Sequence, residues 1–301
     1  MPRSYGFREE PYSAEALRFR STAVGCAVLL LWALGRLLVF LEKALLPQMS
    51  HTAGALFSLI GYCLMLGLPI LLLRGILPLP GRILFPLGKP IRASFWFLPM
   101  VLGTLTLLNI LGWGLAALLR RTVTVPPYAP AFGSTPAEIT INLLASTLFP
   151  AVLEELFFRG AVLQGLRGFG ERRALAVGAL LFMVCHPSVL QWVPALGAGF
   201  LFGWLALRTG SLRWGILLHL CYNLYAALSA LFPGAWSQVL LPGLFILVGS
   251  IAFFVLLLRG GFRRAAFSPP ARCCVSLWTI PLVFAVLLMG WSALSSLTLV
   301  A

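Results

Sequence analysis

Two adjacent glutamates, Glu154 and Glu155, stand in the middle of a long apolar stretch of the chain. Two of the three histidines, His186 and His219, also fall in apolar stretches, and Asn223 follows His219 by four residues. An ionisable side chain costs about 2.5 to 3.5 kcal/mol at the centre of a bilayer, so such residues mark functional sites by default. A carboxylate, two imidazoles and an amide can activate water and stabilise an oxyanion, which is the chemistry of amide hydrolysis.

The spacing around the glutamates separates their expected roles. Glu155 and Arg159 are four residues apart and therefore share a helix face, where they can neutralise one another. Glu154 has no such helical partner. Pro150, one turn before Glu154, removes a helical hydrogen bond and is expected to open the helix locally.

Other hydrolase plans fit the sequence poorly. The chain contains no Asp, which excludes an aspartyl dyad. It contains neither the His-Glu-x-x-His zinc motif nor the Gly-x-Ser-x-Gly motif of serine hydrolases. The glutamates and histidines are thus the strongest candidates for catalysis.

The composition shows what must position these residues. The 301 residues are 60% hydrophobic and 10% charged, with a mean hydropathy of +0.98. Because there are too few polar side chains to cover a surface that faces water, most of the exterior must face lipid. Despite a net charge of +14, these values exclude a soluble nucleic-acid binder and a disordered chain. We therefore predict an all-α polytopic membrane protein. Its partner is the lipid bilayer and not nucleic acid.

About nine apolar runs approach the 20 residues that a transmembrane helix needs. We expect a single multi-pass domain over residues 1–301, with a catalytic core of four helices over residues 136–231. A capping box, Thr135-Pro136-Ala137-Glu138, begins the first helix of this core. The nine runs lie near residues 22–41, 52–73, 94–119, 136–165, 174–190, 192–208, 213–231, 238–258 and 275–298.

The distribution of basic residues predicts the orientation. With nine spans, seventeen Arg and Lys residues fall on the side of the N-terminus and only Lys43, Arg120 and Arg121 on the other, while Arg36 and Arg159 lie inside spans. The positive-inside rule therefore predicts a cytoplasmic N-terminus and an external C-terminus. Arg outnumbers Lys by twenty to two, which is typical of a GC-rich bacterial genome, so we expect the bacterial cytoplasmic (inner) membrane.

Depth gives an independent reason to group the polar residues. At 1.5 Å per helical residue, Glu154, His186, His219 and Asn223 lie roughly 10 to 18 Å from the cytoplasmic ends of their spans. Three helices would thus place four polar groups in one layer of the bilayer.

Structural interpretations remain open for the separate residues. Glu155 and Arg159 could form a buried ion pair that fixes helix packing. A single histidine or Asn223 could form an interhelical hydrogen bond. The rival function is a non-catalytic membrane scaffold, or a proton-coupled transporter that uses the Glu and His cluster as a relay.

Three ordered motifs resemble those of one family. They are Glu154-Glu155-Leu-Phe-Phe-Arg159, Phe182-Met-Val-Cys-His186 and His219-Leu-Cys-Tyr-Asn223. This set resembles the CAAX protease and bacteriocin-processing (CPBP, or Abi) family of intramembrane endopeptidases, over residues 136–231.

The resemblance implies a role for each matching residue. Glu154 would activate water with the help of His186, while His219 and Asn223 would bind the oxyanion. Glu155, Arg159 and Phe182 would orient the site. The family is often classed as metalloendopeptidases, and Glu154, His186 and His219 could also ligate zinc. We favour a glutamic mechanism without a cofactor, because Asn223 is a poor zinc ligand and a good oxyanion donor.

The expected substrate is a membrane-associated protein or peptide. It could be a prenylated C-terminus, a peptide or bacteriocin leader, or the sorting signal and anchoring tail of a surface protein. A bacterial source favours the anchoring tail or the leader as substrate. No single residue of the sequence identifies the substrate. The six cysteines show no metal-ligand spacing and are expected to pack as small apolar residues, although lipidation of Cys273 and Cys274 is an alternative.

Overall fold

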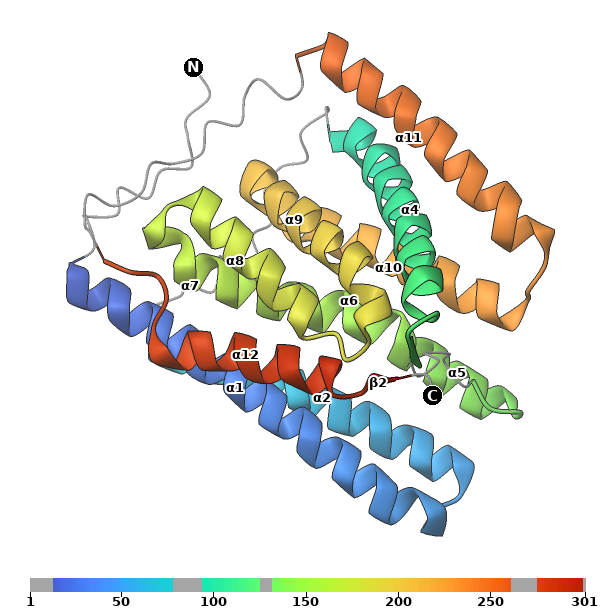
Figure 1. The fold of residues 1–301 in the computed structure, drawn as a ribbon, viewed down its shortest axis with the longest axis horizontal. Coiled ribbons are helices and arrows are strands. Elements are labelled where there is room, and N and C mark those ends of the chain that lie inside the picture. Colours follow the sequence, from blue (N-terminus) through green and yellow to red (C-terminus); the bar gives the residue numbers. More distant parts are fainter. Residues whose placement is uncertain (1–12, 78–93, 125–131, 261–274, 300–301) are drawn as a thin grey trace.

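The computed structural model describes residues 13–77, 94–124, 132–260 and 275–299, and this part of the chain is almost entirely helical. Seven of its helices are long and apolar enough to cross a membrane. The chain is therefore a polytopic all-α membrane protein, as the composition predicts (Figure 1). The described residues form one short antiparallel pairing, between β1 (Val123–Thr124) and β2 (Thr298–Leu299). Cys273 and Cys274 lie outside the described residues.

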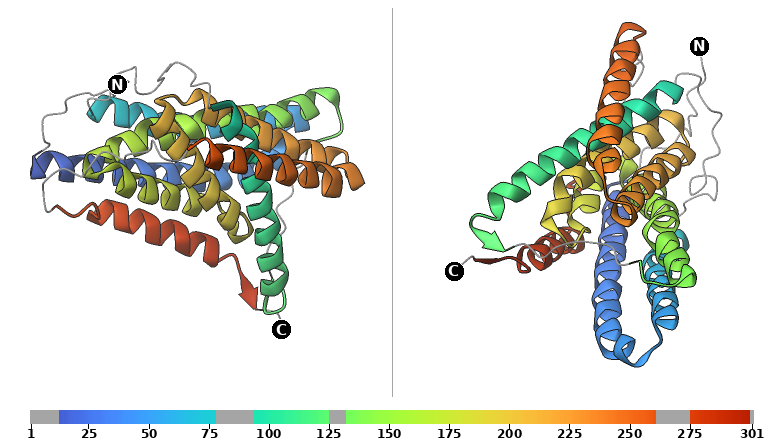
Figure 2. Two further views of the ribbon diagram at one scale, coloured as in Figure 1. Left: turned by 90° about the horizontal axis from the view of Figure 1, so that it is seen from above. Right: turned by 90° about the vertical axis from the view of Figure 1, so that its right-hand side faces the viewer.

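The first two helices form a long hairpin whose end projects from the other helices (Figure 2). Helix α1 (Ala14–Leu45) and helix α2 (His51–Ile76) are joined by the short 3-10 helix η1 (Leu46–Gln48). Ser13 and Ser50 cap the two long helices, because each hydroxyl accepts a hydrogen bond from a backbone N–H of the first turn. The hairpin thus has well-defined helix starts.

Glycines allow two other helices to cross closely. Helix α4 (Ser94–Leu119) packs against α11 (Leu241–Leu258). A Cβ atom on Gly249 would lie 2.8 Å from the Cα atom of Gly103. A larger residue at position 249 would therefore force these backbones apart.

The predicted helix over residues 136–165 is interrupted. Its capping box is present, since the Thr135 hydroxyl accepts from the N–H of Glu138 and the Glu138 carboxylate accepts from the N–H of Thr135. The first segment ends at Ser146, because Pro150 has no N–H to donate to the carbonyl of Ser146 and its ring crowds that carbonyl. The segments are α5 (Pro136–Ser146), α6 (Leu148–Glu154), the π-helix η2 (Glu155–Val162), α7 (Leu163–Leu166) and the 3-10 helix η3 (Arg167–Phe169).

Two of the nine predicted runs form helices shorter than a membrane span. Helix α8 (Glu171–Val184) has 14 residues and α12 (Ile280–Leu294) has 15, so they are about 21 and about 22.5 Å long, against ~30 Å of hydrocarbon. The run at 174–190 ends early because Pro187 disfavours helical geometry at the residue before it, His186. His186 therefore lies just beyond a helix rather than within one.

The remaining elements complete the bundle around the predicted core. After α8 come the 3-10 helix η4 (Val189–Gln191), α9 (Trp192–Thr209), α10 (Arg213–Leu231) and the π-helix η5 (Trp236–Leu240). Helix α8 packs against α9, and α12 packs against α1 (Figure 1). At the second crossing a Cβ atom on Gly25 would lie 2.5 Å from the backbone nitrogen of Leu282, so the two helices are in close contact.

Candidate active site

The two glutamates lie where the α-helix α6 gives way to the π-helix η2. Glu154 is the last residue of α6 and Glu155 is the first of η2. Short π-helical segments occur frequently at functional sites, because they redirect side chains within a continuous helix. Adjacent helical residues point about 100° apart, so each carboxylate has a partner of its own besides the histidine that lies near both.

Glu155 is held in a buried ion pair with Arg159. The Arg159 Nη1 atom lies 2.7 Å from Oε1 of Glu155, and the two side chains are 2% and 1% exposed. Nη2 donates a hydrogen bond of 3.0 Å to the carbonyl oxygen of Ala198. The guanidinium carbon lies 4.2 Å from the ring centre of Phe182 and 5.3 Å from that of Phe202. The buried cation is thus matched by a carboxylate, a carbonyl and two aromatic faces.

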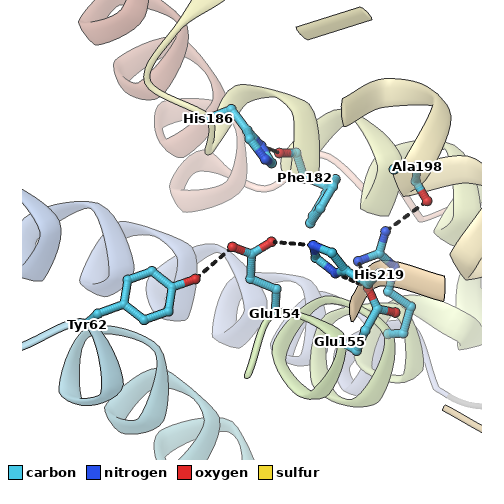
Figure 3. A network of polar contacts seen from close by, with 8 residues as sticks. Tyr62, Glu154, Glu155, Phe182, His186, Ala198 and His219 are labelled. Carbon is cyan, nitrogen blue, oxygen red and sulfur yellow. Dashed lines mark hydrogen bonds and ion pairs between the residues drawn. The ribbon is translucent and has the colours of Figure 1, made fainter. Parts of the chain in front are cut away.

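His219 lies between the two glutamates (Figure 3). Its Nδ1 atom lies 3.2 Å from Oε1 of Glu155, and its Nε2 atom lies 3.8 Å from Oε2 of Glu154. An ionised carboxylate only accepts hydrogen bonds, so Nδ1 of His219 is the donor to Glu155. Gly215, one turn earlier on α10, makes room for this contact, because a Cβ atom there would lie 2.7 Å from Oε2 of Glu155.

Glu154 is anchored from a different helix. The hydroxyl of Tyr62, on α2, donates a hydrogen bond of 2.7 Å to Oε1 of Glu154 (Figure 3). Oε2 of Glu154 is buried and has no hydrogen-bond partner among the described residues. The side chain as a whole is 18% exposed. One carboxylate oxygen is therefore fixed, while the other has its acceptor capacity unused by the described protein groups.

His186 is fixed by both its ring and its backbone. Its Nδ1 atom lies 2.7 Å from the carbonyl oxygen of Phe182, and Trp192 Nε1 donates a hydrogen bond of 3.2 Å to the carbonyl of His186. A carbonyl only accepts, so Nδ1 carries the proton and Nε2 remains available. The Phe182 ring lies 4.9 Å from the His186 ring and 6.2 Å from that of His219, so it packs beside both histidines.

A cavity of about 1160 Å³ connects the predicted residues. Glu154, His186, His219 and Asn223 all line it, from α6, the turn after α8, and α10. Asn223 lies one helical turn after His219, as its spacing predicts. The structure therefore brings the four polar residues to one cavity, whereas their catalytic roles stay predictions. Its walls also include Trp32, Met65, Trp113, Leu190 and Met289.

Sequence reasoning missed four residues that shape the site. Tyr62 and Trp192 donate hydrogen bonds to Glu154 and His186, and the Phe202 ring lies 5.5 Å from that of His219. Gly215 leaves space for Glu155. The sequence signals for these residues were weak: Tyr62 is a polar aromatic residue in the apolar run at 52–73, and Gly215 lies one turn before His219. Neither signal identifies its partner without the tertiary structure.

The alternative zinc site does not fit the described arrangement. Within the part of the chain that the structure describes, no three His, Cys, Asp or Glu side chains are close enough to hold one metal ion. Nδ1 of His219 contacts Glu155 and Nδ1 of His186 contacts a carbonyl, so Nε2 is the ring atom that each histidine has left for a ligand. The distances among the described side chains, rather than their ring contacts, are what fit a zinc site poorly.

Comparison with protein families decides what this site belongs to. Residues 136–225 match the family model described as type II CAAX prenyl endopeptidase Rce1-like. This segment is similar to that family, in agreement with the resemblance of its three motifs to the CPBP family. The match contains all three motifs, from Glu154 to Asn223, and it supports a CAAX protease-like endopeptidase in a multi-pass membrane protein. Comparisons with curated proteins and with solved structures gave no match.

Proposed function

We propose that this protein acts as a CPBP-type endopeptidase, which hydrolyses a peptide bond at the membrane through a water molecule activated by Glu154. The single observation that carries the proposal is the position of Glu154 in the shared cavity. Tyr62 fixes Oε1, and Oε2 accepts no hydrogen bond from the described residues. A fixed carboxylate with spare acceptor capacity is what a general base requires.

The water would lie close to Glu154 and His219. Two atoms 3.8 Å apart, Oε2 of Glu154 and Nε2 of His219, can both contact a single molecule at about 2.8 Å. Glu154 takes one proton from the water as its oxygen bonds to the substrate carbonyl carbon, and the C=O electron pair moves onto the oxygen. Nε2 of His186, left available by its Nδ1 contact, accepts a hydrogen bond from the second water hydrogen.

His219 and Asn223 would stabilise the resulting oxyanion. In its doubly protonated form, His219 donates to Glu155 through Nδ1 and to the oxyanion through Nε2. Once Glu154 has taken its proton, the charges of the oxyanion, Glu155, Arg159 and protonated His219 sum to zero, which suits a site of low dielectric. The proton on Glu154 next passes to the leaving nitrogen, and the C–N bond breaks as the oxyanion electron pair re-forms the C=O bond.

The substrate is proposed to be a membrane-associated protein or peptide, cut at a C-terminal tail, a sorting or anchor signal, or a leader. The cavity is larger than the usual 300 to 1000 Å³ of a small-molecule site and lies among membrane-length helices. Both features suit a peptide segment that enters from the bilayer. We place the protein in a bacterial cytoplasmic membrane with the N-terminus inside, on the basis of its basic residues.

The test compares membrane proteomes of cells that carry the wild-type chain, Glu154→Gln or Glu15→Gln. Glu15 is an exposed residue in the first turn of α1 and provides the matched control. We expect at least one uncleaved precursor to accumulate with Glu154→Gln and none with Glu15→Gln. Identical processing in all three strains, at equal protein levels, would contradict the proposed function.

A further inference from the structure

Arg36 is a charged residue on α1 that the proposed mechanism does not use. It lies nine residues before the end of α1, about 14 Å along the helix axis, with Gly35 before it and Leu37 after it. Its side chain is exposed and lines the same cavity as Glu154. A cation at a membrane-spanning position is costly unless a partner or water stabilises it, so its position in the cavity needs an explanation.

The packing of the α1–α2 hairpin places Arg36 level with Tyr62. A Cβ atom on Gly35 would lie 3.2 Å from the Sδ atom of Met65, and one on Gly61 would collide with the Leu38 side chain. Arg36 on α1 therefore lies opposite the stretch of α2 between residues 61 and 65. Tyr62 belongs to that stretch and contacts Glu154 directly (Figure 3). The Arg36 side chain thus leaves α1 at the level of Tyr62, the residue whose hydroxyl contacts Glu154.

The charges that line the cavity favour an anion. Arg36 has no carboxylate or aromatic partner among the described residues, whereas Arg159 has both. The only other described charged residues that line the cavity are Arg120 and Glu154, apart from the titratable histidines. One carboxylate against two guanidinium groups leaves a positive surplus.

We propose that Arg36 binds a carboxylate of the peptide substrate and thereby selects the bond that is cut. The inference rests on the proposed function and names a substrate feature for the same site. A guanidinium binds a planar carboxylate through two parallel hydrogen bonds, which fixes position as well as charge. Because Arg36 is level with Tyr62, the bound carboxylate would lie within a few residues of the scissile bond. It belongs to the substrate's C-terminus or to an acidic side chain.

Peptide binding to the Glu154→Gln protein in lipid nanodiscs tests the inference without turnover. The probe is a pool of apolar nonapeptides of Ala, Leu, Ser and Val in three forms: a free C-terminal carboxylate, a C-terminal amide, and a C-terminal amide with one internal Glu. Arg36→Gln is compared with Arg18→Gln, which removes an exposed arginine from the same helix outside the cavity. The first and third forms distinguish the two sources of the carboxylate.

We expect at least one carboxylate-bearing form to bind about 10- to 100-fold more tightly than the plain amide. Arg36→Gln should abolish this difference without weakening binding of the amide, and Arg18→Gln should preserve it. Equal affinity for all forms, or no measurable binding, contradicts the inference. So does a preference that survives Arg36→Gln. None of these outcomes bears on precursor accumulation with Glu154→Gln, so failure of the inference and failure of the proposed function can be told apart.

Discussion

Tyr62 donates a hydrogen bond of 2.7 Å to Oε1 of Glu154, although the two residues are 92 positions apart. Tyr62 lies on α2, outside the segment that matches the family model, whereas Glu154 lies within it. The α1–α2 hairpin is thus part of the candidate site and more than a membrane anchor.

Tyr62→Phe should therefore slow hydrolysis while leaving the protein folded. Loss of one hydrogen bond to a carboxylate costs about 1.5 to 3 kcal/mol, which corresponds to about a 10- to 100-fold lower rate if the bond orients the base. The matched control is Tyr225→Phe, which removes a 2.8 Å hydrogen bond to the carbonyl of Ser237. Steady-state rates on a precursor measure the effect, and equal rates for the two variants would argue against a positioning role for Tyr62.

Glu155→Gln should destabilise the protein far more than Glu154→Gln. Removal of one partner of a buried ion pair leaves the other charge uncompensated, at a cost of about 3 to 5 kcal/mol. Arg159 would be left in this state, at 2% exposure. Thermal melts in one detergent should show a much lower midpoint for Glu155→Gln. Equal midpoints for the two variants would mean that the ion pair does not stabilise the fold.

Local sequence spacing predicts some of this site well. The pair of Glu155 and Arg159 follows from residues four apart on one helix, and the capping box at Thr135 follows from a four-residue pattern. Both depend only on neighbours along the chain. Depth in the membrane and the family resemblance both predict that His186 and His219 lie near Glu154. Neither predicts the distances and contacts among the three side chains.

The features that were missed depend on tertiary contacts. The helix expected over residues 136–165 breaks at Thr147, and the π-helix that follows starts at Glu155. Pro150 signals a disturbance but not which hydrogen-bond pattern replaces the α-helix. The contact between Glu154 and Tyr62 requires the packing of α2 against α6, which no periodicity specifies.

Gly215→Ala should disturb the site through a single methyl group. The added Cβ would lie 2.7 Å from Oε2 of Glu155, so the carboxylate or helix α10 must shift. We expect a lower melting midpoint and at least a tenfold loss of activity. Gly243→Ala on α11, where a Cβ meets nothing within 4 Å, should instead stabilise its helix by up to about 1 kcal/mol. If Gly215→Ala behaves like Gly243→Ala in melts and rate measurements, the close packing at Glu155 is unimportant.

Hydrolysis should survive metal chelation but not the loss of Asn223. Removal of one oxyanion donor typically lowers turnover by about 100- to 1000-fold, so Asn223→Ala should reduce kcat with little change in KM. A strong chelator should leave the wild-type rate unchanged. Inactivation by the chelator with rescue by zinc would instead indicate that Glu154, His186 and His219 bind a metal. A metal assay on the purified protein accompanies the kinetics.

The rate of peptide-bond hydrolysis by purified Glu154→Gln protein tests the central claim most directly. The amide keeps the shape of the carboxylate but cannot take a proton from water, and general-base catalysis contributes about 100- to 10,000-fold. With a precursor identified in cells as substrate and a melting midpoint close to that of the wild type, we predict a loss of at least about 100-fold. A rate comparable to that of the wild type would contradict the assignment of Glu154 as the base.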